Sequence, residues 1–256
     1  MTFCIGVQIA EGLIALSDTR IVRGEQISQK AKLSMLGGDV GGAFVMTSGL
    51  RSVRDKVVRR LEDEIKAERV QTDRMHQIAT AFGALIRTVK AEDGEALAEG
   101  GLTFNAHAIL GGQLAADDEP MLLHVYPEGN WVEATPDAPY FIVGRSYYGK
   151  PILDRLLTFE TPLPDALSLA YLAFDATRAS ATDVDFPIDV AVLRRGENRF
   201  TQRRYGAREL ESVARSWNDH LRDALAELPV TWTTPLLDPS PPGGDATDPT
   251  DSTEHT

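Results

Sequence analysis

Thr2 combines in one residue the two groups that a form of covalent catalysis requires. Methionine aminopeptidases remove Met1 efficiently when the second residue is small, and Thr2 meets that condition. Removal of Met1 would leave Thr2 with a nucleophilic hydroxyl and a free α-amine that can serve as its base. An α-amine titrates near pH ~7.7–8, so a useful fraction is unprotonated near neutrality. The simpler alternative is that Thr2 is a permissive second residue.

The residues behind Thr2 predict the hairpin that would hold it. Ile5, Val7 and Ile9 alternate with the residues between them, which is typical of a strand, and a tight turn is expected at 10–12. Residues 13–17 would return as a second strand, followed by Ser17-Asp18-Thr19-Arg20. A further strand is predicted at 27–35.

This order of residues resembles the β-type subunits of the proteasome family of N-terminal nucleophile hydrolases. The family pattern is a mature N-terminal Thr, a Gly turn, a strand ending in Asp-x-Arg, and Ser-x-x-Ala-Lys, which here reads Ser28-Gln29-Lys30-Ala31-Lys32. Gly144-Arg145-Ser146-Tyr147-Tyr148-Gly149-Lys150-Pro151 is similar to a motif of the bacterial ancestral β-subunit group, Anbu. The resemblance covers roughly residues 2–230.

The resemblance implies a catalytic set around Thr2. Lys32 would favour ionisation of the Thr2 hydroxyl through its positive charge. A buried lysine needs a carboxylate partner, and Asp18 would be that partner, with Arg20 holding Asp18 or the adjoining loop. Lys30 remains an alternative to Lys32, because both would point to the same face of a regular strand.

Three further residues complete the implied proton and oxyanion groups. Gly49 lies at a strand-to-helix junction, where its N–H can stabilise an oxyanion. Ser146 would hydrogen-bond the α-amine, and Ser180 stands where proteasomal subunits have Asp. Arg145 and Asp183 depart from the group's pattern, which has an acidic residue and a Ser at the corresponding places. These departures put efficient turnover in question.

The same resemblance predicts a pocket for the residue that precedes the cut. Thr47 and Arg51 would form one wall, with Ile21 and Lys30 on the other. An Arg in this wall would favour acidic or polar side chains. The simpler interpretation is that an Arg at a helix start points to solvent.

The elements follow in segregated runs of strands and helices. Apolar residues at helical spacing predict helices through 53–65 and 75–89, with Thr72 or Asp73 as the N-cap of the second, and a loop over 91–101. Strands are expected at 42–47, 103–111, 120–126, 130–134, 140–143, 188–193 and 199–203, a turn at 37–39, and helices at 152–157, 167–174 and 210–225. Such runs indicate an α+β fold, which the resemblance sharpens to a four-layer αββα sandwich.

Composition sets the remaining expectations. Residues 1–230 are predicted to form one domain, and residues 231–256, rich in Pro, Asp and Thr, a disordered acidic tail. A net charge of −12 argues against nucleic acid or an anionic membrane as the main partner. The chain has no signal peptide pattern or membrane-length apolar run, and Cys4 is its one cysteine, so we expect a cytoplasmic protein. The five histidines show no metal-ligand spacing, and we expect no metal or cofactor.

Together these observations predict a proteasome-like N-terminal threonine peptidase or amidohydrolase. It would act on peptide or isopeptide-like amide bonds within a homo-oligomeric ring or open helical ring. The alternative is a catalytically weak or inactive assembly scaffold on the same fold, which the departures at Ser180 and Asp183 motivate. A protease that depends on a separate unfoldase ring is a third, less favoured hypothesis.

Overall fold

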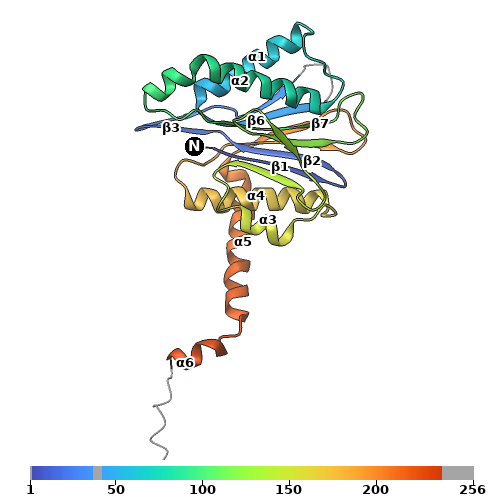
Figure 1. Ribbon diagram of the computed structural model, residues 1–256. Helices are drawn as coiled ribbons and strands as arrows, with labels where there is room; N and C mark the ends of the chain where they lie inside the picture. The colour runs from blue at the N-terminus through green and yellow to red at the C-terminus, as the bar shows by residue number, and fades with distance from the viewer. Residues whose placement is uncertain (1, 37–41, 238–256) are drawn as a thin grey trace, which may run out of the picture. The chain divides into compact units, whose positions relative to one another are not determined.

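Two antiparallel five-stranded sheets lie face to face in the computed structural model, which describes residues 2–36 and 42–237 (Figure 1). The first sheet has the order β10-β1-β2-β11-β12. Its strands are β1 (Phe3–Ile9), β2 (Gly12–Asp18), β10 (Tyr140–Gly144), β11 (Ile188–Arg194) and β12 (Thr201–Tyr205).

The second sheet has the order β5-β6-β7-β8-β9. Its strands are β5 (Leu33–Leu36), β6 (Ala43–Gly49), β7 (Ala106–Gly112), β8 (Met121–Val125) and β9 (Trp131–Glu133). A separate two-stranded ribbon joins the two sheets along the chain and consists of β3 (Arg20–Arg23) and β4 (Gln26–Gln29).

Helices cover the outer face of each sheet (Figure 1). Helices α1 (Arg51–Lys66) and α2 (Met75–Glu99) pack on the second sheet, and α4 (Leu163–Ser180), beside α3 (Lys150–Leu156), packs on the first. The order of layers is therefore helix, sheet, sheet, helix. The predicted α+β four-layer αββα sandwich is confirmed.

β1 is buried on both of its faces, which explains its nearly unbroken apolar sequence. On one face Phe3 contacts Phe174 of α4, with ring centroids 6.1 Å apart. On the other face Cys4 belongs to the apolar cluster between the sheets. A Cβ at Gly6 would lie 2.7 Å from Leu122 Cδ1 of the facing sheet, so a glycine permits this close approach. The residue before β1 is thus held at the end of a fully packed strand.

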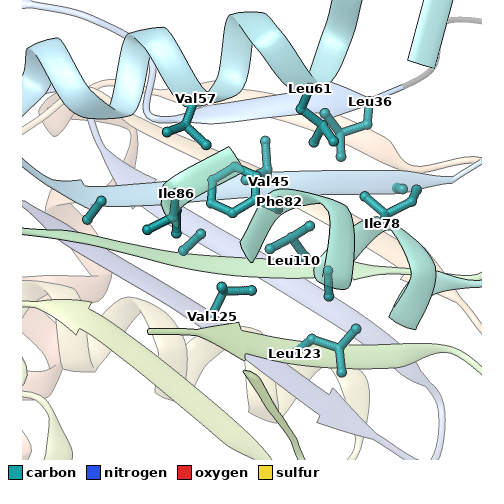
Figure 2. Packing of buried hydrophobic residues seen from close by; sticks show 14 of the residues in the cluster. Leu36, Val45, Val57, Leu61, Ile78, Phe82, Ile86, Leu110, Leu123 and Val125 are labelled. Carbon is teal, nitrogen blue, oxygen red and sulfur yellow. The ribbon is translucent and has the colours of Figure 1, made fainter. Parts of the chain in front are cut away.

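A second apolar cluster fills the space between the second sheet and its two helices (Figure 2). Val57 and Leu61 of α1 and Phe82 and Ile86 of α2 point down onto Val45, Leu110 and Leu123 of the strands. Burial of these side chains fixes α1, whose first turn follows Gly49 directly.

The continuous strand predicted at 27–35 is wrong. β4 ends at Gln29, β5 begins at Leu33, and the two strands belong to different sheets. The alternating pattern hid this break, because both strands carry the same period of two residues. As a result Lys30 and Lys32 do not share one strand face.

Two predictions about α2 are also wrong. The helix continues to Glu99 rather than giving way to a loop at 91, because one glycine among good helix formers does not end it. Ion pairs from Lys56 and Arg60 to Glu92 further hold this part of the helix on α1. The helix start is capped neither by Thr72 nor by Asp73: the N–H of Met75 donates to the carboxylate of Asp117, at 3.0 Å.

The chain divides near residues 211 and 212 into two compact units. The second unit contains most of α5 (Ala207–Glu227), followed by the short helices η1 (Thr231–Thr233) and α6 (Thr234–Leu237). Residues 231–237 of the predicted disordered tail therefore form helical turns. The rest of the predicted tail, 238–256, and the predicted turn at 37–39 lie outside the described residues.

Candidate active site

A pocket of about 600 Å³ opens where β1 begins and β6 and β10 end. Residues from both sheets line it, so the pocket exists only because the two sheets pack face to face. The predicted catalytic and oxyanion residues that line it are Thr2, Lys32, Gly49 and Ser146.

Thr2 is buried, with 4% of its surface exposed, and its backbone is fixed by β10. The Thr2 carbonyl accepts a hydrogen bond of 2.8 Å from the N–H of Arg145. Gly144 has φ +96°, and a Cβ there would lie 1.9 Å from the same carbonyl oxygen. A glycine is therefore required at 144 if β10 is to lie this close to Thr2.

Asp18 and Lys32 form an ion pair that is almost completely buried. Lys32 Nζ lies 2.6 Å from Asp18 Oδ1, and the two side chains are 2% and 0% exposed. Asp18 also accepts the backbone N–H groups of Phe3, at 2.8 Å, and Arg20, at 3.2 Å. Burial raises the pKa of Asp18, while the ion pair and the two N–H donors favour its charged form. Asp18 thus binds both Lys32 and Phe3, the residue that follows Thr2.

The structure separates the two candidate lysines. Lys32 lines the pocket with Thr2, whereas Lys30 Nζ binds Asp55 of α1 at 2.6 Å and lines a smaller neighbouring pocket of about 250 Å³. Lys32 is therefore the lysine that reaches the pocket of Thr2.

Gly49 lies on the pocket wall and could not be replaced by a larger residue without strain. Its φ is +116°, and a Cβ there would lie 2.1 Å from the carbonyl oxygen of Asn105.

The structure brings only some of the residues of the predicted specificity pocket together. Ile21 and Arg51 line the pocket of Thr2, while Thr47 and Lys30 line the smaller one beside it. Arg51 is also engaged with Asp55, at 3.3 Å.

The two predicted serines are placed differently. Ser146 lines the pocket, and its N–H donates to the Gly144 carbonyl at 3.1 Å. Ser180 is the last residue of α4, is exposed, and does not line the pocket. The chain ends its helix there and turns inward only afterwards, so a residue at 183 reaches the site's surroundings instead.

Arg145 and Asp183, which both depart from the pattern of the Anbu group, pair with each other. Arg145 donates to Asp183 through Nη2 at 3.1 Å and Nε at 3.4 Å. Burial acts to raise the pKa of Asp183, but the hydrogen bond and the charge of Arg145, together with other positive charge nearby, lower it overall. Arg20 likewise binds Asp185 at 2.7 Å with its side chain, while its backbone N–H holds Asp18. These two ion pairs tie the segment after α4 to the surroundings of Thr2.

Cys4 does not compete with Thr2 as a nucleophile. The thiol is fully buried, and burial raises its pKa to about 12. Since the thiolate is the reactive form, Cys4 is an inert core residue.

A histidine pair that the sequence did not predict lies on the pocket wall. His107 Nδ1 and His124 Nε2 lie 3.2 Å apart on adjacent strands, and both line the pocket. Burial lowers the pKa of His107, and burial together with His107 lowers the pKa of His124 to about 4. Their meeting depends on the register of β7 with β8, which no local sequence pattern specifies.

Arg54 of α1, which was also not predicted, is a buried cation that lines the same pocket. A signal was present: Arg54 stands among Val53, Val57 and Leu61 in the apolar stripe of the helix. A charge in such a stripe is unusual and indicates a specific environment.

Within residues 2–36 and 42–237, no three His, Cys, Asp or Glu side chains gather as a metal site would require. In the same part of the chain, no helix has the length and apolar character needed to span a membrane.

Replacement of Asp18 by Asn tests the buried ion pair. Asp18→Asn removes the carboxylate that pairs with the buried Lys32 charge, and we expect the free energy of unfolding to fall by about 3 kcal/mol. Urea denaturation at neutral pH measures this loss. Asp55→Asn is the matched control, because its pair with Lys30 is partly exposed, and it should cost less than about 1 kcal/mol. Equal losses in the two variants would contradict the account.

The histidine pair predicts a pH dependence of stability. The pKa of His124 is about 4 in the folded chain and near 6.5 when unfolded, so acid protonates the unfolded chain first. Stability should be constant above pH ~6.5 and fall as the pH drops toward ~4, by on the order of 2 kcal/mol after allowance for partial exposure. His124→Gln should remove this part of the decline in urea denaturation, and the exposed control His220→Gln should not. An unchanged slope in His124→Gln would contradict the prediction.

The proteasome subunit family matches residues 2–193. A comparison with curated proteins gave no match.

Solved structures extend the likeness over most of the chain. A structure described as a helical assembly of the Anbu complex from Pseudomonas aeruginosa is 31% identical, with 94% of this chain and 98% of that chain covered and a TM-score of 0.82. Anbu from Yersinia bercovieri is 30% identical over 89% of this chain and 98% of its own, with a TM-score of 0.81. A Gly-1 mutant of Anbu from Hyphomicrobium sp. strain MC1 is 30% identical, over 90% and 98% of the two chains, with a TM-score of 0.81. The chain belongs to the proteasome subunit family, and within it to the bacterial Anbu group of ancestral β-subunits.

Proposed function

We propose that this chain is an N-terminal threonine peptidase or amidohydrolase, with Thr2 as nucleophile after removal of Met1. The observation that carries the proposal is the buried Asp18–Lys32 ion pair, whose lysine lines the same pocket as Thr2. Burying both charges costs several kcal/mol per ion. A pair held at that cost beside a threonine is suited to favour ionisation of its hydroxyl.

The reaction would begin with attack of the Thr2 hydroxyl on the carbonyl carbon of an amide. The hydroxyl proton passes to the neutral α-amine of Thr2, and a bond forms between Thr2 Oγ1 and the carbonyl carbon. The charge that develops on the carbonyl oxygen would be stabilised by the N–H of Gly49. The α-ammonium then protonates the leaving amine as the amide bond breaks.

The second half of the cycle removes the acyl group from Thr2. The α-amine, again neutral, would take a proton from water, and the resulting hydroxide attacks the ester carbon. The ester bond breaks, Thr2 regains its proton, and the carboxylic acid leaves. Ser146, on the pocket wall, would hydrogen-bond the α-amine and help move its proton. The substrates would be short peptides or isopeptide-like amides.

Intact mass spectrometry with a peptide epoxyketone tests this function. The reagent needs both the hydroxyl and the free α-amine of an N-terminal threonine. We expect purified protein to lack Met1 and to gain one adduct on Thr2, and Thr2→Ala to gain none. Retention of Met1 in native protein would contradict the proposal and favour the scaffold alternative. Labelling of Thr2→Ala to the same extent would place the nucleophile elsewhere.

We also propose that the chain assembles with copies of itself and acts in the cytoplasm. The Pseudomonas aeruginosa protein is described as a helical assembly, which supports the first point. Helix α5 supports it independently, because none of its residues is buried although apolar side chains recur along it. Among these, Val213, Leu221 and Leu225 are exposed. The single buried cysteine supports the second point.

Light scattering after size-exclusion chromatography tests the role of α5 in assembly. The double variant Leu221→Glu with Leu225→Glu should reduce the molar mass toward that of a single chain, since charges would replace apolar contacts between copies. Arg222→Glu changes the net charge by the same amount on the same helix and should keep the mass of the unmodified protein. An unchanged mass in the double variant would show that α5 does not hold the assembly.

A further inference from the structure

Arg54 is a buried cation whose donors are mostly unused. Its residue surface is 6% exposed, and its guanidinium makes one hydrogen bond, from Nη1 to the Thr47 carbonyl at 3.1 Å. Its Nε is buried and has no hydrogen-bond partner among the described residues. Within residues 2–36 and 42–237, no carboxylate lies within ion-pair distance of it.

The cations around Arg54 are already paired. Lys32 binds Asp18, and Lys30 and Arg51 share Asp55. Asp55 follows Arg54 in the chain, but its carboxylate is bound by Lys30 and Arg51. Arg54 therefore differs from its neighbours in lacking a counter-charge within the part of the chain that the structure describes.

An unpaired buried charge is costly, and the cost requires a reason. Burial lowers the pKa of Arg54, yet a guanidinium does not lose its proton in proteins. It offers a planar fork of donors that matches the two oxygens of a carboxylate. An anion that enters the site would supply the missing counter-charge and accept the unused donors.

The pocket itself has the charge that an anion needs. Arg54, Arg51 and Lys32 line it, and no Asp or Glu of the described residues does. Leu50, Ile142 and Val143 contribute apolar surface beside these cations. Thr2 lies in the same pocket, so an anion bound by Arg54 would be close to the nucleophile.

We propose that Arg54 binds a carboxylate on the acyl part of the substrate, beside the carbonyl that Thr2 attacks. The pocket would then select acidic acyl groups. The carboxylate can be the side chain of a Glu or Asp that precedes the cut, or the free α-carboxylate of a γ-glutamyl isopeptide. This inference rests on the proposed function, because the acyl group is defined by attack from Thr2.

Two matched pairs of epoxyketones test the inference by their rates of adduct formation at Thr2, measured by intact mass. The first pair carries Glu or Gln next to the epoxyketone. The second pair is built on the side chain of glutamate, with the α-carboxyl either free or amidated. We expect the acidic member of one pair to react about tenfold faster or more than its neutral partner. Preference in the first pair identifies a side-chain carboxylate, and preference in the second identifies a terminal one.

Arg54→Met should abolish that preference and leave the rate of the neutral reagent within about threefold. Arg60→Met is the matched control, because this arginine lies on the same helix, binds Glu92 and does not line the pocket, and it should keep the preference. If Arg54→Met does not fold, the test is the ratio of the acidic to the neutral labelling rate in unmodified protein. The same ratio is then measured in Arg54→Lys, which keeps the charge but loses the planar fork of donors. Equal rates within both pairs would overturn the inference and leave the proposed function intact. Labelling by none of the reagents would remove the proposed function, and the inference with it.

Discussion

The arrangement around Thr2 depends on one interaction, the buried ion pair between Asp18 and Lys32. Asp18 closes β2, accepts the N–H of the first residue of β1, and holds Lys32 at the entrance of the second sheet. A charge of either sign alone at this depth would be strongly unfavourable. The chain can therefore bury a lysine beside Thr2 only because the carboxylate that neutralises it comes from the same hairpin that carries Thr2.

The rest of the fold serves to bring strand ends from two sheets to one place. The β1–β2 and β1–β10 registers place Thr2 beside Asp18 and Gly144, and β6 delivers Gly49 from the opposite sheet. Glycines at 144 and 49 adopt left-handed conformations that bring backbones within van der Waals contact there. Arg145 and Asp183, which depart from the family pattern, form an ion pair and so neutralise each other's charge.

The parts of the site that could be predicted from the sequence are those that are encoded locally. The alternation in residues 3–17 predicted the hairpin, and the family resemblance assigned Asp18, Lys32, Gly49 and Ser146, all of which lie in or next to the pocket. It could not separate Lys30 from Lys32, because the break between β4 and β5 arises from sheet packing rather than from residue pattern. The contact of His107 with His124 was missed for the same reason, because it depends on which strand lies alongside. Arg54 was missed although its place in the apolar stripe of α1 marked it. The position of Ser180 outside the pocket depends on where α4 ends, which is among the least predictable features of a sequence.

The most direct test of the central claim compares two lysines that differ by two positions in sequence. Lys32→Met and Lys30→Met remove the same charge, and both variants can be labelled with a peptide epoxyketone while the rate of adduct formation at Thr2 is followed by mass. If Lys32 favours ionisation of the Thr2 hydroxyl, Lys32→Met should slow labelling by about a hundredfold or more, and Lys30→Met should leave the rate within a few-fold of the unmodified protein. Equal rates in the two variants, or a larger loss in Lys30→Met, would contradict the account.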